Sequence, residues 1–169
     1  MAQYEYKFQS KHQLNDVSDD SDQLIWLFHV DKIPPHIGIS SQGVFFSLKS
    51  NGQDEIPTYK VNQIVENKSI KLIKVKLRCE LSSSALKEVF ANYTSATSNG
   101  CSCLVPIREA LQITENVQKL ASLLNHLEAH NKIEGWYANN VSFNEAGIRP
   151  YEVHAVSYTH LTLPTTPYV

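Results

Sequence analysis

The sequence has few cysteines, no long apolar run and no excess of one charge. Its three cysteines are an odd number, and no charged segment followed by an apolar one opens the chain, so we expect a reducing, cytoplasmic location rather than a disulfide framework. No apolar run approaches the roughly 18 residues that span a bilayer, so we expect no membrane span. Fifteen basic residues against 17 acidic ones, a net charge of -2, argue against a nucleic-acid partner.

The length and composition are those of one ordinary globular domain. The chain has 169 residues, 42% hydrophobic and 19% charged. Residues 156–169, however, resemble the translation of a transposase-type sequencing adapter, and we interpret them as an artefactual tail. We therefore expect a single domain over 1–155, with the natural C-terminus beyond about Ala155 missing.

The first third of the chain is rich in strand patterns. Residues 3–9 alternate aromatic and polar side chains, whereas 24–30 are continuously apolar and predict a central strand buried on both faces. The polar, acidic stretch 10–22 between them predicts a surface loop. Residues 36–40 and 44–48 flank a glycine-containing turn and predict a hairpin.

The rest of the chain predicts helices around one further strand. A short helix is expected after Pro57, and the alternation over 73–79 predicts a strand with a solvated basic face, suited to a sheet edge. Ser82–Ser84 offer N-caps for the next helix, Pro106 suits the start of another, and Thr114 is expected to cap a last helix ending near 130–131. No element is predicted over 133–155. The fold class is thus α+β, a mainly antiparallel sheet packed against helices.

Two features are suited to nucleophilic catalysis. Cys101 and Cys103 lie where a loop leads into a helix, and a helix N-terminus favours a thiolate over a thiol. His36 begins a predicted strand just after two prolines, where a rigid imidazole can act as a general base toward a thiol.

At these residues the chain resembles the permuted papain-like cysteine hydrolases and acyltransferases, which include NlpC-type peptidases and lecithin:retinol acyltransferase-like proteins. The resemblance covers three short motifs: Asp22-Gln-Leu-Ile-Trp26, the hairpin from Pro35-His36-Ile-Gly-Ile39 to Gly43-Val-Phe-Phe-Ser-Leu48, and Cys101-Ser-Cys-Leu-Val105. It implies a permuted papain-like fold in which Cys101 or Cys103 attacks an amide, peptide or acyl ester and His36 moves the proton.

The resemblance places Ser47 where the family has the residue that orients the histidine. A hydroxyl can accept one hydrogen bond from the imidazole but supplies no charge to stabilise an imidazolium. The motif favours Cys101 as the nucleophile, whereas the expected contact with the helix start favours Cys103. Because Ser47 stands in place of a stronger orienting residue, a second interpretation stays open, in which the scaffold is a non-catalytic binding or regulatory module with a protein partner.

The sequence does not predict a metal or cofactor. A site built from Cys79, Cys101, Cys103 and a histidine would lack the usual zinc spacing. His126 and His130 lie four residues apart, a spacing that can bind metal, but Glu128 is not where a metalloprotease places its base. We interpret these histidines as part of a solvated helix face.

Overall fold

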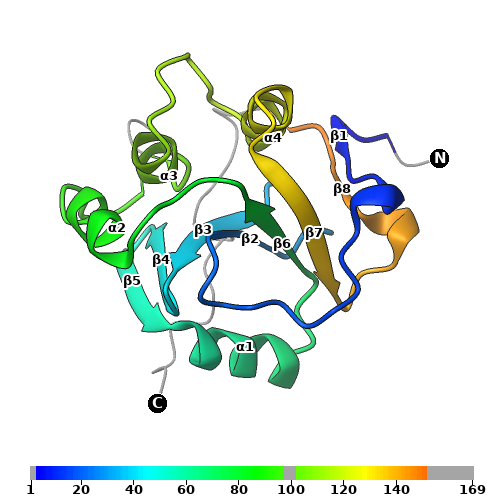
Figure 1. Cartoon of the computed structure of the whole chain (residues 1–169), viewed down its shortest axis with the longest axis horizontal. Coiled ribbons are helices and arrows are strands. Elements are labelled where there is room, and N and C mark those ends of the chain that lie inside the picture. The colour runs from blue at the N-terminus through cyan, green and yellow to red at the C-terminus, as the bar shows by residue number, and fades with distance from the viewer. Residues whose placement is uncertain (1–2, 97–101, 152–169) are drawn as a thin grey trace.

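The centre of the fold is a six-stranded antiparallel sheet with the strand order β5-β4-β3-β2-β6-β7 (Figure 1). The computed structural model describes residues 3–96 and 102–151. The strands of this sheet are β2 (Leu24–Phe28), β3 (His36–Ser41), β4 (Val44–Lys49), β5 (Gly52–Pro57), β6 (Leu72–Leu77) and β7 (Ile133–Asn139). A separate antiparallel pair is formed by β1 (Tyr6–Lys7) and β8 (Gly147–Ile148). The α+β class and the mainly antiparallel sheet are as predicted.

Helices cover both faces of the sheet (Figure 1). They are α1 (Thr58–Asn67), α2 (Ser83–Phe90), α3 (Val105–Ala110) and α4 (Leu120–Ala129), with short 3-10 turns η1 (Ser10–His12) and η2 (Phe143–Glu145). One apolar cluster lies between the sheet and α1, and a larger one lies between the sheet and α2, α3 and α4. Within the two described ranges, every helix is too short or too polar to traverse a bilayer.

Strand β2 is central, as its continuous apolarity predicts. It pairs with β3 on one side and β6 on the other, and all five of its side chains are buried. Because side chains alternate along a strand, Ile25 and Leu27 enter the cluster under α2–α4, whereas Trp26 and Phe28 enter the cluster under α1.

The β3–β4 hairpin is also as predicted. Ser41 pairs with Val44, and the two residues between them, Gln42 and Gly43, both have positive φ angles (53° and 80°). This is the left-handed conformation that tight two-residue hairpin turns require, and it explains the glycine at the turn.

Local signals predicted the starts of α2 and α3 but not that of α4. The Ser82 side chain accepts a hydrogen bond from the Ala85 N–H (3.1 Å) and caps α2, and Pro106 stands in the first turn of α3, both as predicted. The expected cap at Thr114 is wrong: the last helix, α4, begins at Leu120 with Lys119 as its N-cap, because the chain before it runs without regular structure.

The prediction that β6 lies at a sheet edge with a solvated basic face is wrong for the edge and for Lys74. The strand lies between β2 and β7 rather than at an edge, and Lys74 is only 3% exposed. Its ammonium group is 3.2 Å from an Asp20 carboxylate oxygen, donates to the Asn62 side-chain oxygen at 2.9 Å and lies 4.2 Å from the centre of the Trp26 ring. The segment 10–22, predicted to be a surface loop, thus covers Lys74, and its Asp20 pairs with the ammonium group.

Candidate functional site

His36 projects toward α1. It is the first residue of β3 and pairs with Phe28 of β2, and the two rings stack with centroids 5.7 Å apart. Only 1% of the histidine is exposed. Its ring therefore lies on the α1 side of the sheet, in the aromatic cluster that contains Phe28.

The buried His36 ring is uncharged. Burial, with smaller contributions from the charges of Lys49 and His29, lowers the pKa of His36 to about 3. Among the described residues, its Nε2 has no hydrogen-bond partner, although it is buried. A neutral imidazole can accept a proton, but a base with so low a pKa accepts one weakly near neutral pH.

Ser47, the expected orienting residue, is directed to a different partner. It lies in β4, and its Oγ donates a hydrogen bond to an Asp54 carboxylate oxygen at 3.1 Å. The other carboxylate oxygen of Asp54 is 3.1 Å from the Lys49 ammonium group, and both charged side chains are buried. Asp54 was not predicted, because its strand, β5, carries a largely polar sequence with no clear alternation.

Cys103 lies in the larger apolar cluster, on the other face of the sheet. It is 7% exposed and lines a cavity of about 20 Å³ beside Ile37, the neighbour of His36 on β3. Adjacent residues of a strand point to opposite faces, so Ile37 faces Cys103 while His36 faces α1. The structure thus does not bring Cys103 and His36 together. Cys101, the other predicted nucleophile, lies outside the described residues.

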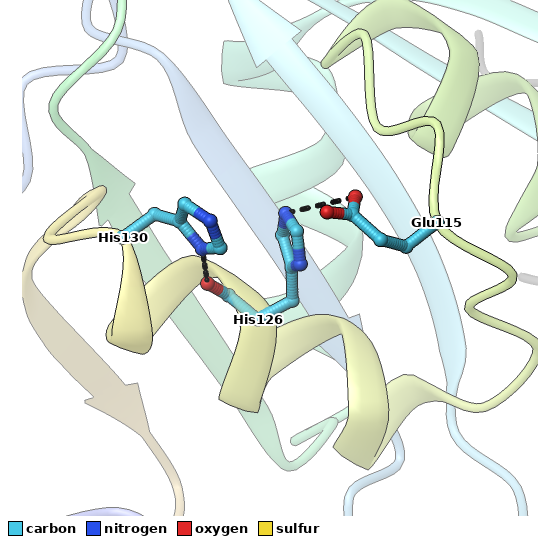
Figure 2. Close-up of side chains that lie close together, drawn as sticks. All are labelled: Glu115, His126 and His130. Carbon is cyan, nitrogen blue, oxygen red and sulfur yellow. Dashed lines mark hydrogen bonds and ion pairs between the residues drawn. The ribbon is translucent and has the colours of Figure 1, made fainter.

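A different set of side chains does converge. His126 lies on α4, His130 follows one turn later as the C-cap residue of that helix, and Glu115 reaches them from the segment between α3 and α4 (Figure 2). One ligand atom from each of the three lies within 4.8 Å of the others. The Nε2 of His126 is 3.7 Å from a Glu115 carboxylate oxygen, and the two imidazole rings stack with centroids 4.2 Å apart. We call these three residues the Glu-His-His cluster.

A backbone hydrogen bond orients His130. Its Nδ1 is 2.8 Å from the carbonyl oxygen of His126, which is one turn earlier on the helix (Figure 2). A carbonyl can only accept a hydrogen bond, so Nδ1 carries a hydrogen, and in the neutral ring the lone pair is on Nε2. This is how metal-binding histidines are commonly held.

The Glu-His-His cluster lines a cavity of about 480 Å³, the size of many small-molecule sites. The remaining walls come from the segment after β6, from the end of α3 and the α3–α4 connection, and from the end of α4 and the residues after it. They are Cys79, Glu80, Leu81, Ala110, Leu111, Gln112, Ile113, Thr114, Leu127 and Lys132. Burial raises the pKa of the Cys79 thiol, with Lys132 opposing the shift, so this thiol is protonated near neutral pH.

Sequence reasoning found two members of the cluster and missed the third. The spacing of His126 and His130 was visible, but we interpreted it as a solvated helix face. Glu115 precedes α4 in a segment with no regular structure, and no local pattern shows where such a segment lies. No family model matches the chain, and no curated protein or solved structure matches it either.

Proposed function

We propose that the protein is a non-catalytic binding module whose ligand is a divalent transition-metal ion held by Glu115, His126 and His130. The observation that carries this proposal is the convergence of two imidazoles and one carboxylate within 4.8 Å. Imidazole nitrogens suit Zn²⁺, Cu²⁺ and Ni²⁺, and a carboxylate completes a set found in many zinc sites.

One of the three ligand–ligand distances already suits a zinc ion, and the other two are at most 4.8 Å. Zinc–ligand bonds of about 2.0–2.1 Å in tetrahedral geometry put ligand atoms about 3.4 Å apart. The 3.7 Å between His126 and Glu115 is close to that value. The Glu115 side chain is 60% exposed and that of His126 is 17% exposed, so the glutamate can move onto an ion that the more fixed histidine has bound.

The test is calorimetric titration of the full-length, tag-free chain with Zn²⁺. We expect one site whose affinity falls about tenfold or more in His126→Gln and in Glu115→Gln. His12→Gln is the matched control, because His12 is exposed on η1 and takes no part in the cluster. Equal affinities in wild type and both cluster variants would refute the proposal.

A second candidate function is the thiol hydrolase or acyltransferase that the sequence motifs imply, on a permuted papain-like scaffold with Cys101 as the nucleophile. The observation that favours it is the buried Nε2 of His36, which has no hydrogen-bond partner in the described part of the chain. The Ser47–Asp54 hydrogen bond adds a buried carboxylate to the same side of the sheet. The substrate would be an amide, a peptide or an acyl ester.

This second candidate is tested by the rate of thiol alkylation, followed by mass spectrometry of each cysteine over about pH 5 to 9. A catalytic pair predicts fast labelling of Cys101 well below the ordinary thiol pKa, slowed in His36→Ala. The variant must first show a native circular dichroism spectrum, and His12→Ala serves as the control. Slow labelling that is the same in all three proteins would exclude the thiol enzyme.

A further inference from the structure

We propose that the metal ion in the Glu-His-His cluster keeps a coordination position open toward the cavity, and that this position binds the carboxylate of a small molecule with an apolar tail. The inference rests on the proposed metal-binding function and names the ligand class of the same site.

The number of protein ligands leaves the ion incompletely coordinated. Three side chains in the described ranges form the cluster, and tetrahedral Zn²⁺ or Co²⁺ takes four ligands. Cys79 and Glu80 line the same cavity, but neither belongs to the group of atoms within 4.8 Å. Sites with three protein ligands take water or an exogenous molecule at the remaining position, whereas closed structural sites have four.

The open position faces the cavity. Glu115, His126 and His130 all line it, so an ion that they hold lies at its wall. A volume of about 480 Å³ is large enough for a small organic molecule to replace the water in the cavity. A ligand atom bound to the ion can therefore belong to a molecule that fills the cavity.

Charge selects an anionic head group. A divalent ion with one carboxylate ligand retains one positive charge, because both histidines must be neutral to bind it. Lys132 adds a second cation to the wall and Glu80 adds one anion. A carboxylate satisfies both the ion and the lysine, whereas an ammonium group would be repelled by both.

Apolar walls select the tail. Leu81, Leu111 and Ile113 are partly buried, pack against the larger apolar cluster and line the cavity. An alkyl chain attached to the carboxylate would cover these side chains and displace water from them, which is favourable for each methylene buried.

The experiment uses the visible absorption of Co²⁺ as the reporter. The full-length chain loaded with Co²⁺ is titrated with hexanoate, acetate and hexanol. We expect hexanoate to change the cobalt spectrum and to bind about tenfold or more tightly than acetate, since only hexanoate has a tail to bury. Hexanol should leave the spectrum unchanged, because it lacks the carboxylate.

Variants separate the two parts of the ligand. Ile113→Ala should weaken hexanoate binding and leave acetate binding unchanged, and Lys132→Gln should weaken both. Lys87→Gln is the matched control, because Lys87 is exposed on α2 and does not line the cavity.

The failures of the two proposals are distinguishable. A cobalt spectrum that is absent, or that is the same in His126→Gln, would overturn the metal site itself. A spectrum that depends on His126 but does not respond to saturating hexanoate would overturn only the open position and its ligand. Equal binding of hexanoate and acetate would overturn the apolar subsite.

Discussion

The Nδ1 of His130 is hydrogen bonded to the backbone carbonyl of His126 at 2.8 Å, while the imidazoles of the two residues stack with centroids 4.2 Å apart. The first contact fixes which nitrogen of His130 carries the hydrogen, and the second holds its ring against His126. The helix therefore supplies two oriented ligands before any ion arrives, so an ion gains more binding energy than it would from two mobile rings.

Zinc is expected to stabilise the folded chain. An ion that binds only the native state at about a hundred times its Kd adds about 2.7 kcal/mol to the free energy of unfolding. Differential scanning calorimetry should show a Tm that rises with Zn²⁺ concentration in wild type. In His130→Ala the rise should be largely lost, whereas in His12→Ala it should be retained. The same rise in His130→Ala would contradict a site at this position.

His36 makes the protein sensitive to acid. Its pKa is about 3 in the folded state and about 6.5 in an unfolded chain, so between these values the unfolded state binds more protons. The contribution of neutral His36 to the free energy of unfolding is therefore fully present above about pH 6.5. It falls by about 1.4 kcal/mol for each pH unit as the pH drops toward 3. Urea unfolding between about pH 7 and pH 4 measures this slope.

The variant His36→Gln tests the assignment, because glutamine is polar and does not titrate. We expect a shallower fall in the free energy of unfolding with decreasing pH, even if the variant is less stable at neutral pH. His12→Gln should retain the wild-type slope. The prediction is wrong if the slopes of wild type and His36→Gln are the same.

Two neighbouring lysines of β6 should differ sharply in their importance. Lys74→Ala leaves Asp20 without its buried partner and should lower the free energy of unfolding by about 3 kcal/mol. Lys76 is paired with Asp22 and Glu134, but its side chain is 25% exposed, so Lys76→Ala should cost less than about 1 kcal/mol. Chemical denaturation of both variants gives the comparison, and equal losses would contradict it.

Gly38 makes room for an aromatic ring. A Cβ at this position would overlap the ring of Phe45 and approach the carbonyl oxygen of Phe46 at 3.0 Å. We expect Gly38→Ala to destabilise the protein by about 1–3 kcal/mol, measured by urea unfolding. Part of that loss should be recovered in Gly38→Ala/Phe45→Leu, relative to the sum of the two single variants. Strict additivity would show that the ring is not the cause.

Local patterns were sufficient where one element's own residues decide its structure. The side chains of β2 are all apolar, so the strand is buried on both faces. Gly43 readily adopts the positive φ angle that the hairpin turn requires. Ser82 caps α2 through a partner three residues away. In each case the deciding interaction is local in sequence or is simple burial, so it could be predicted.

Partners distant in sequence decided the rest. Lys74 looked solvated because its alternation is that of a half-exposed strand, but Asp20 arrives from another segment to cover it. Strand β5 has little apolar character of its own and forms because β4 offers an unpaired edge. These outcomes depend on tertiary packing, which local propensity does not describe.

Residue types over short spans were enough to predict the α+β class, the central strand β2, the β3–β4 hairpin and the Ser82 cap of α2, because burial and backbone conformation follow from them. Tertiary packing put His36 and Cys103 on opposite sides of the sheet and brought Glu115 to His126 and His130. The physical reason is that a chemical site depends on where side chains from separate segments point, and only packing of the whole chain fixes those directions.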